Sequence, residues 1–556
     1  MTNPKNNIEI EINIKNYGLI KVESGITLRN FCSQIESKLA LPPVAGLIEK
    51  SLVDLNYRFE KPCTVELIDI TSEMGLRVYR WTAAFLLLKA SNDLYPHKKL
   101  IVRHSLSNGL YCEFEDEEIS KDVIENLKNK ITDLIAKDIP INRKLINKKE
   151  AIKIFEQQEQ LDKVRLLNFR DKVNVHVYEL DGFYEYSYGF MLPSTGMVDK
   201  FKLLQYKPGL ILQTPEKDDP TTIKDYIEQP KLANIFNESK SWAKMLNTPH
   251  VAALNDIIEN SDIGDIIRVN EALHEKKIAS FADMICNDSN IRLVLISGPS
   301  SSGKTTLAQR LLVQLRVNGR RPVSISLDNY FVDRELTPKD ENGDYDFEAL
   351  EALKLDLFNE HLIKLIKGEE VEIPIYNFKT GKAEPYGVPL SVPEGEPIII
   401  EGIHALNERL TKSIFKDKKF KIYISALTQL NLDTTNRIPT TDCRLIRRMV
   451  RDSRTRGYSA LGTISRWPSV RRGEDKNIFP FQEQADVIFN SSLVYELSAL
   501  KIQAENLLKN IDNSKPEYTE AQRLLKFLSY FRPIETDDIP NNSILREFIG
   551  GSCFKH

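Results

Sequence analysis

The sequence predicts a multidomain α/β protein in which a mostly parallel sheet forms the C-terminal part and two smaller α+β units precede it. Three observations support this fold class. The chain has 556 residues, enough for three or four domains of about 150 residues each. From residue 291 onward, strand-like runs alternate with helical patterns, as they do in βαβ units. Residues 1–212 instead mix short alternating strands with helices.

The composition is typical of soluble globular proteins. Hydrophobic residues make up 41% and charged residues 28%, and the 24 glycines and 26 prolines are too few for a collagen-like or low-complexity chain. The 76 Lys and Arg residues nearly balance the 79 Asp and Glu residues, giving a net charge of −3. No overall positive field therefore draws the whole chain to nucleic acid or anionic lipid, and any such binding must be local.

The spacing of the cysteines and the composition of the N-terminus indicate the cellular compartment of the protein. The six cysteines are widely spaced without a C-x-x-C pair, which argues against a zinc ribbon or a dense disulfide framework. The N-terminus lacks the apolar core of a signal peptide, and no stretch approaches 18 consecutive apolar residues. We therefore expect a cytoplasmic protein without a membrane partner. We also expect a homo-oligomer.

Residues 1–70 are predicted to form a small α+β domain. Residues 8–20 alternate apolar and polar side chains, as in IEIEINI, which is the period-two pattern of a half-buried strand. A helical segment follows near Leu28–Leu39, and TVELIDI at 64–70 repeats the strand pattern.

Residues 71–214 are predicted to form a second α+β domain. An apolar helical run at Arg80–Leu94 is followed by the strand-like segments IVRH and GLYCEF. A charged helix over 117–137 and aromatic-rich strands over Val173–Leu212 complete the unit.

Three further parts follow. Residues 215–288 are expected to form a helical connector, because helical patterns there are broken by polar segments rather than by Gly/Ser repeats. Residues 289–500 hold the parallel sheet. Residues 501–556 are expected to form a helical C-terminal tail that ends in a frayed segment, ETDDIPNNSILREFIGG, with no recognisable motif.

The segment GPSSSGKT at 298–305 matches the phosphate-binding pattern G-x-x-x-x-G-K-[ST] in full. Its glycines let backbone N–H groups surround phosphate oxygens at a helix N-terminus, its lysine reaches the β- and γ-phosphates, and its threonine can ligate Mg²⁺. A chance turn would not explain the strand before it and the helix after it. The predicted ATP-binding residues are Gly298, Pro299, Ser300, Ser301, Ser302, Gly303, Lys304, Thr305 and Thr306.

Two carboxylates follow predicted strands. Asp328 comes directly after SISL, at the sheet edge where α/β proteins place ligands, and could accept a proton from an alcohol that attacks the γ-phosphorus. As an isolated residue it would be a helix cap or turn residue. Glu401 ends the run PIIIE, where a carboxylate can organise Mg²⁺ and its waters. The alternative for Glu401 is a plain strand-end charge.

A basic run lies between Cys443 and Lys476, with ten positive residues against three negative ones. It could be a nucleic-acid patch or a solvated helix face. Beside a phosphate loop, we interpret it as a lid whose arginines stabilise the charge on a transferring phosphoryl group.

These residues resemble the uridine kinase/phosphoribulokinase family over residues 289–495. The matching stretches occur in the family's order: GPSSSGKTT, Asp328-Asn329-Tyr330, IPIYNF at 373–378, IIIEGIHAL at 398–406, the R-R-x-x-R-D-x-x-x-R-G lid at Arg447 to Gly457, and QADVIFN. The resemblance implies a P-loop kinase fold and phosphorylation of an alcohol, with ATP and Mg²⁺ as cofactors and a small-molecule acceptor as partner.

The resemblance also implies roles. Catalysis is assigned to Asp328 as base and to Lys304, Arg451 and Arg456, and the metal to Thr305 and Glu401. Substrate binding is assigned to Asp346 near the ribose hydroxyls, Tyr376 in the base pocket, and Arg447. Asp346 could instead cap a helix, and Tyr376 could be a core residue.

The chain departs from the family at two places. Pyrimidine nucleoside kinases have a histidine five residues after the tyrosine that corresponds to Tyr376, and this chain has Gly381 there. In the lid, the family's R-G-R-D becomes Arg456-Gly457-Tyr458-Ser459. Both changes concern the acceptor or the lid, so the identity of the acceptor stays open.

The N-terminal part resembles pieces of threonyl-tRNA synthetases. Residues 1–70 resemble a TGS domain, a β-grasp module, through GITLRNF and PPVAGLIEKSLVDLNYRFEKPCTVELI. Residues 76–212 resemble the second additional, editing-type domain, through RWTAAFLLLKASNDLYPHKK and SNGLYCEFE. The synthetase's aminoacylation core is absent from the sequence.

The metal-binding centre of that editing-type domain is missing here. Its H-x-x-x-H positions fall on Trp81 and Phe85, and no Cys or His occurs between His176 and His250. Because aromatic rings cannot ligate Zn²⁺ or activate water, we predict no editing activity. His97, His104 and His176 are expected to be structural or exposed rather than metal ligands.

An aromatic cluster in the same part could stack nucleic-acid bases, but strand aromatics more often pack in a core. Its members are Phe183, Tyr184, Tyr186, Tyr188 and Phe190.

Our preferred hypothesis is an ATP-dependent phosphotransferase that phosphorylates the 5′-hydroxyl of a uridine- or cytidine-type nucleoside, with an N-terminal half that binds or regulates. Two alternatives stay open: a nucleotide-dependent RNA-binding or regulatory protein, and a kinase for another hydroxylated metabolite such as a sugar phosphate. The intact set of Lys304, Thr305, Asp328 and Glu401 favours an enzyme, because a pure switch needs no acceptor-side base.

Overall fold

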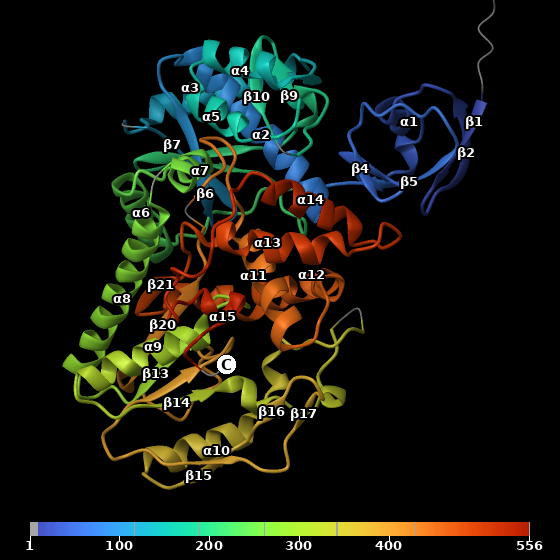
Figure 1. Cartoon of the computed structure of the whole chain (residues 1–556). Helices are drawn as coiled ribbons and strands as arrows, with labels where there is room; N and C mark the ends of the chain where they lie inside the picture. Colours follow the sequence, from blue (N-terminus) through green and yellow to red (C-terminus); the bar gives the residue numbers. More distant parts are fainter. Residues whose placement is uncertain are drawn as a thin grey trace, which may run out of the picture.

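The computed structural model describes residues 9–554, except residues 116, 188, 261, 341–342 and 429. Figure 1 shows one elongated body with the N-terminal unit beside it as an arm. The second unit forms one end of the body, the parallel sheet lies towards the other end, and the C-terminal helices lie between them. No helix in the described part of the chain is long and apolar enough to cross a membrane.

The arm is a five-stranded sheet, ordered β2-β1-β5-β3-β4, with helix α1 packed against it. Along β1, buried isoleucines alternate with exposed polar residues, as the sequence pattern predicts. The predicted run over 8–20 is in fact a hairpin, because Asn16 (φ 73°) and Gly18 (φ 90°) turn the chain through the left-handed region. The elements are β1 (Glu9–Ile14), β2 (Gly18–Glu23), α1 (Leu28–Gln34), β3 (Ala45–Ile48), β4 (Ser51–Val53) and β5 (Cys63–Ile68).

The second unit contains two sheets, β11-β12-β7-β6 and β10-β9-β8, packed around the long buried helix α2. Ser72 caps α2 by accepting a hydrogen bond from the N–H of Gly75. The elements are α2 (Glu73–Leu94), β6 (Leu100–Leu106), β7 (Gly109–Phe114), α3 (Lys121–Ala136), β8 (Asn142–Asn147), α4 (Lys148–Gln157), α5 (Leu161–Asn168), β9 (Asn174–Leu180), β10 (Phe183–Tyr186), β11 (Lys202–Tyr206) and β12 (Gly209–Gln213).

The segment between this unit and the parallel sheet is helical, as expected, with α6 (Pro230–Met245), α7 (Val251–Asn260) and α8 (Ile263–Asn287). Helix α8 packs along α9 and shares its hydrophobic core. This helix is therefore part of the domain that follows and not a free linker.

The parallel sheet has the order β14-β19-β13-β20-β21, and every neighbouring pair is parallel, which confirms the predicted fold class. Strand β13 is buried on both faces, because Leu293 and Leu295 pack on the side of α10 while Val294 and Ile296 pack on the side of α8 and α9. The elements are β13 (Leu293–Ser297), α9 (Lys304–Val317), β14 (Val323–Ser326), α10 (Leu355–Ile366), β15 (Val371–Ile373), β16 (Tyr376–Asn377), β17 (Lys382–Ala383), β18 (Val388–Leu390), β19 (Ile398–Glu401), β20 (Lys419–Ser425), α11 (Thr440–Thr455), α12 (Ala460–Asn477) and β21 (Val487–Asn490).

The C-terminal tail is helical, as predicted, but its last part is not frayed. Helices α13 (Glu496–Lys509), α14 (Tyr518–Leu528) and α15 (Arg546–Ile549) belong to the core that contains α9. Ile544, Leu545 and Phe548 are fully buried. The prediction failed because these apolar residues stand among polar ones without helical or strand periodicity.

Candidate functional site

The phosphate loop connects β13 to α9, and its two glycines are required by geometry. A Cβ on Gly298 would lie 1.9 Å from the carbonyl oxygen of Ile424, so no larger residue fits there. Gly303 has φ 91° and precedes the first residue of α9, Lys304. The loop therefore has the backbone form of a phosphate cradle at a helix N-terminus.

Buried residues of the predicted lid hold this loop from behind. Glu474 of α12 accepts a hydrogen bond from the N–H of Ser300 at 2.9 Å. Arg444 of α11 donates to the Ser300 carbonyl at 3.0 Å and also pairs with Glu474, and both side chains are fully buried. Arg448 donates to the Ser300 hydroxyl at 2.8 Å. Part of the basic run is thus structural, and Arg444, Arg448 and Glu474 were not among the predicted site residues.

The structure corrects the substrate-binding role predicted for Arg447. Its side chain is 0% exposed, pairs with the carboxylate of Glu496, and donates to the Ser491 carbonyl at 2.8 Å. It lies behind the phosphate loop, where an acceptor molecule cannot touch it.

The predicted metal residues lie together. Thr305, in the first turn of α9, donates its hydroxyl hydrogen bond to the Glu401 carboxylate at 3.2 Å. Glu401 ends β19, which neighbours β13, so the sheet itself brings the two residues together. Burial and the neighbouring Asp328 carboxylate raise the pKa of Glu401 to about 7. A cation at this point would relieve that repulsion.

Asp328 lies in the short helix Leu327–Tyr330 directly after β14, on the same edge of the sheet. Its side chain is 36% exposed, and one carboxylate oxygen is 3.9 Å from Nη2 of Arg456. The Arg456 guanidinium also stacks on the ring of Phe378, with Cζ 4.3 Å from the ring centroid. Burial and the neighbouring Arg451 lower the pKa of Arg456 to about 10. The predicted base therefore has a cation beside it and remains open to an acceptor.

Lys304 and Arg451 complete the predicted catalytic set. The Lys304 amine donates to the Pro299 carbonyl at 3.2 Å, and burial lowers its pKa, against the attraction of Glu401 and Asp328. Arg451 pairs with Asp452 at 2.8 Å and lies 3.9 Å from Glu547 of the C-terminal tail. Glu547 was not among the predicted site residues. No sequence signal marks it, because it is 241 residues from its partner Thr306, to which it is hydrogen-bonded.

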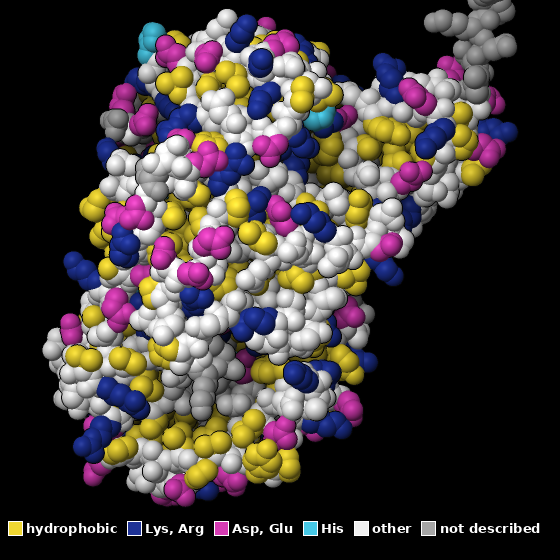
Figure 2. All heavy atoms as spheres, in the orientation of Figure 1, with side chains coloured by type: hydrophobic (Ala, Val, Ile, Leu, Met, Phe, Trp, Pro, Cys, Tyr) yellow, Lys and Arg dark blue, Asp and Glu magenta, His cyan; other side chains and the backbone are white. Residues whose placement is uncertain are grey.

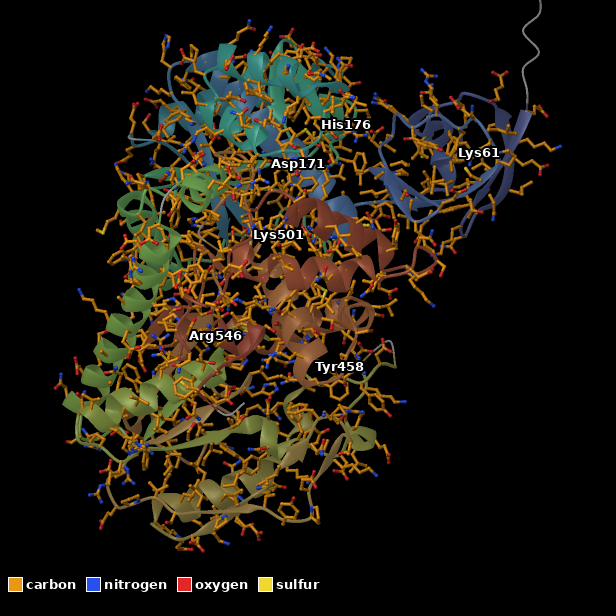
Figure 3. All side chains as sticks on the ribbon, viewed as in Figure 1. Lys61, Asp171, His176, Tyr458, Lys501 and Arg546 are labelled. Atoms are coloured by element: carbon orange, nitrogen blue, oxygen red, sulfur yellow. The ribbon has the colours of Figure 1, made fainter. Side chains whose placement is uncertain are left out.

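The acceptor side carries aromatic rings and, beside them, Arg334. Tyr376 lies against Phe378 and Phe331, with ring centroids 5.2 and 5.7 Å away. Gly381, where the family has a histidine, has φ 74°, and a Cβ there would lie 2.7 Å from the Arg334 guanidinium. Arg334 occupies the space that a side chain at position 381 would need. Figure 3 shows Tyr458 of the lid on this side of the molecule.

Asp346, predicted to lie near the ribose hydroxyls, has a turn-forming role in the structure. Its carboxylate accepts from the Glu348 N–H at 3.1 Å, and its own N–H donates to the Pro338 carbonyl at 2.7 Å. Contact with an acceptor stays a prediction for this residue.

In the second unit, apolar packing fills the positions of the missing metal ligands. The ring of Trp81 lies directly on Gly189, where a Cβ would be 1.6 Å from it. Phe85 is buried and stacks on Phe183 at 5.9 Å. Among the described residues, no group of three or more His, Cys, Asp or Glu side chains could hold a metal ion.

The aromatic cluster and the histidines of this unit are mostly structural. Phe183 and Tyr186 are buried, which favours the core interpretation over base stacking, while Tyr188 lies outside the described residues. His104 is stacked on Phe236 at 3.7 Å. Figure 3 shows His176 on the side of the unit that faces the arm.

The N-terminal and C-terminal parts of the chain are similar to different known proteins. Residues 293–498 match the family described as Phosphoribulokinase / Uridine kinase family. The N-terminal region is similar to threonine–tRNA ligases, with 28% identity over 197 residues to that of Clostridium kluyveri and 32% over 183 residues to that of Symbiobacterium thermophilum. These matches confirm both resemblances stated above.

The matches to the ligases are partial. They cover 35% and 32% of this chain, and 31% and 28% of the two ligases, so the chain spans about a third of the length of these curated relatives. Among solved structures, a possible uridine kinase from Bacillus stearothermophilus is 20% identical, covering 36% of this chain and 89% of its own, with a TM-score of 0.24.

Proposed function

We propose that this chain is a kinase that transfers the γ-phosphoryl group of ATP to a hydroxyl of a small-molecule acceptor. One observation supports this above all. A single edge of the parallel sheet collects the phosphate loop with Lys304, the Thr305–Glu401 pair at 3.2 Å, and the open carboxylate of Asp328. A nucleotide-binding switch would need the first two features but not the third.

The residues present fit ATP and Mg²⁺. The hydroxyls of Ser301 and Ser302 are buried without a hydrogen-bond partner among the described residues, which suits phosphate oxygens as acceptors. Thr305 and Glu401 supply the oxygen atoms that Mg²⁺ prefers. When bound, Mg·ATP supplies the phosphoryl group and a metal charge that offsets its negative oxygens.

Each protein group then has a distinct task. Lys304 attracts the terminal phosphate oxygens, and Arg456 stands where negative charge develops beside the acceptor. Asp328 accepts the proton of the acceptor hydroxyl as its oxygen bonds to phosphorus. Arg456 lies 3.9 Å from Asp328, so its positive charge stands beside the carboxylate that takes the proton.

We further propose that the acceptor hydroxyl is the 5′-hydroxyl of a nucleoside. The half-buried rings of Phe331 and Phe378 are of the kind on which a base stacks, while Tyr376, which is itself buried, packs against both of them. Arg334 occupies the space in which the family has a histidine. Because a guanidinium can pair with a phosphate group, a sugar phosphate is the alternative acceptor to a nucleoside. A cytoplasmic location, supported by six unpaired cysteines, and self-association remain proposals.

An ATP-consumption assay across nucleosides and sugar phosphates tests this function. We expect turnover with at least one acceptor, loss of turnover in Lys304→Ala, and a fall of about 10²–10⁴-fold in Asp328→Asn. Lys367→Ala and Asp356→Asn change the same residue types at exposed positions and should behave as wild type. Turnover no higher than that of Lys304→Ala with every acceptor would contradict the proposal.

A second candidate function, RNA binding by the N-terminal half, rests on one basic cluster. Lys172 is the exposed member of this cluster, since Arg143 is paired with Asp54 at 3.2 Å and Arg170 is buried. Burial together with the charges of Arg143, Lys172 and Arg170 lowers the pKa of Lys526 of α14 to about 8. A bound phosphate would relieve this repulsion. Figure 2 shows acidic and basic side chains interspersed over the rest of this face.

Filter binding with tRNA at two salt concentrations tests this second function. Lys172→Ala should weaken binding at low salt, whereas Lys61→Ala, exposed on the arm, should not. No detectable binding at low salt would exclude it.

A further inference from the structure

The C-terminal segment 535–551 lies on the phosphate loop. The Glu547 carboxylate accepts a hydrogen bond from the Thr306 hydroxyl at 2.8 Å, and both side chains are buried. Ile544 covers the turn into α9, since a Cβ on Gly303 would be 2.6 Å from its side chain. In Figure 1, α15 lies at the centre of the molecule beside α11 and close to α9.

The surroundings of Glu547 are those that attract phosphate. Its carboxylate contacts Thr306 in the first turn of α9, where the helix dipole favours negative charge, and lies 3.9 Å from the guanidinium of Arg451. Thr306 belongs to the motif predicted to bind ATP. A nucleotide phosphate on this side of the loop would meet a buried carboxylate already there, and the two negative charges would repel each other.

The segment is held in this position by specific contacts. Arg454 of the lid helix donates to the backbone carbonyl of Glu547 at 2.8 Å, and the ring of Phe548 lies 5.0 Å from the Arg447 guanidinium. Arg546 closes the segment on itself by donating to the carbonyls of Thr536 and Ile539 at 2.8 and 2.6 Å. Figure 3 shows Arg546 between the C-terminal helices and the sheet.

Packing alone does not explain an acid at position 547. Ile544 and Phe548 supply the apolar contacts, and an apolar residue between them would avoid burying a charge. Glu547 is 7% exposed, its carboxylate is bonded to Thr306 and lies 3.9 Å from Arg451, and its charge acts on the phosphate-loop residue Lys304. A carboxylate at this position is explained if it occupies the place where a phosphate group of the nucleotide would otherwise bind.

The segment is also anchored to the N-terminal half just upstream. In α14, Thr519 donates to the Lys50 carbonyl of the arm. Two residues after α14, the Tyr530 hydroxyl is hydrogen-bonded to that of Tyr186 in the second unit at 2.7 Å. The residues directly before the segment are therefore hydrogen-bonded to both units of the N-terminal half.

We propose that residues 535–551 are an inhibitory cap in which Glu547 occupies a phosphate position of the nucleotide site, and that ATP binds only when Glu547 leaves Thr306. The cap rests on the proposed function, since it regulates the same site. Its upstream anchors let the N-terminal half set how readily it leaves.

The test is nucleotide affinity, measured by calorimetry with Mg·ATP on the full chain. Glu547→Gln removes the charge with almost no change in size, and we expect it to bind Mg·ATP about tenfold more tightly than wild type, which corresponds to about 1.4 kcal/mol. Glu535→Gln makes the same change at an exposed position of the same segment and should bind as wild type does. Thermal melting confirms that each variant is folded.

Hydrogen exchange gives an independent measurement in the wild-type protein. Mg·ATP should increase exchange at the backbone amides of residues 543–551, because the cap must leave. Tyr530→Phe, which loses the contact with Tyr186, should increase exchange there without nucleotide.

The outcomes separate the cap from the kinase. Equal affinity in wild type and Glu547→Gln, or added protection of 543–551 on binding Mg·ATP, would overturn the cap while leaving the kinase intact. If neither protein bound Mg·ATP better than Lys304→Ala does, the proposed function and the cap would fall together.

Discussion

Replacing Glu474 by glutamine should destabilise the kinase domain strongly. Glu474 is fully buried and is paired with Arg444, while it accepts from Arg471 at 3.1 Å and from the Ser300 N–H at 2.9 Å. Glutamine keeps an oxygen for Ser300 but leaves the buried Arg444 without a counter-charge. Breaking such a pair costs about 3–5 kcal/mol.

This loss should be visible as a lower melting temperature. For a domain of this size, each kcal/mol lowers the melting temperature by about 2–4 °C, so Glu474→Gln should melt about 6–20 °C below wild type. Trp467 provides a local probe, because its ring lies 5.3 Å from the Arg444 guanidinium. We expect its fluorescence transition to shift together with the calorimetric one.

A double-mutant cycle decides whether the pair itself is responsible. Removing both charges, as Arg444→Met with Glu474→Gln, should be less harmful than the sum of the single losses by about 2 kcal/mol. Asp475→Asn is the matched control, since Asp475 is 45% exposed and its ion pair is worth little. Additive losses in the cycle, or a melting point for Glu474→Gln equal to that of Asp475→Asn, would refute this reasoning.

Three further changes test other parts of the molecule. Arg456→Lys keeps the charge but loses the planar stacking on an aromatic ring, so kcat/KM should fall at least about tenfold while Mg·ATP affinity by calorimetry stays unchanged. Burial raises the pKa of Glu348 to about 7 from 4.5, so the folded protein holds the proton of this carboxyl more tightly than the unfolded chain does. The stability of the folded state that depends on this proton is fully present below pH 4.5 and is lost as pH rises through 7. Denaturant unfolding from pH 5 to 8 should therefore show a decline of about 3 kcal/mol in wild type that Glu348→Gln lacks; equal slopes would contradict this. Gly189→Ala forces a methyl group into the ring of Trp81 and should lower the free energy of unfolding by about 1–3 kcal/mol, whereas an unchanged denaturation midpoint would mean that the ring can move.

The parts of the site that lie on contiguous motifs could be predicted from the sequence. The phosphate loop is shaped by its own glycines, and β13 and α9 fix its place in the fold. Asp328 and Glu401 could be placed as well, since parallel strands end at one edge and β14 and β19 are neighbours. In both cases a local pattern and a general rule of sheet geometry were sufficient.

The lid could be predicted only in part, because a count of charges does not reveal burial. Arg444, Arg447 and Arg451 are spaced i, i+3 and i+7 on α11, so they share the face that meets the phosphate loop. Apolar residues elsewhere around the same helix bury it on other sides too. That mixture of arginine and apolar residues is the signal that separates buried supports from exposed lid charges.

The cap could not have been predicted, since its contacts join residues far apart in sequence. No local sequence pattern links Glu547 to Thr306, which are 241 residues apart. The same holds on the acceptor side, where the fold of the chain between them brings Arg334 against Gly381. Such pairs depend on how whole elements pack, which periodicity does not encode.

The path of the C-terminal helices bears on why the P-loop domain is joined to a synthetase-like half. A passive fusion needs only a linker at residues 215–288. Here the chain returns after the kinase sheet, and α14 with the residues that follow it contacts the arm through Lys50 and the second unit through Arg77 and Tyr186, before 535–551 covers the phosphate loop. The N-terminal half therefore contacts the residues directly before the proposed cap, which is the arrangement expected if what that half binds controls how readily the cap leaves the phosphate loop.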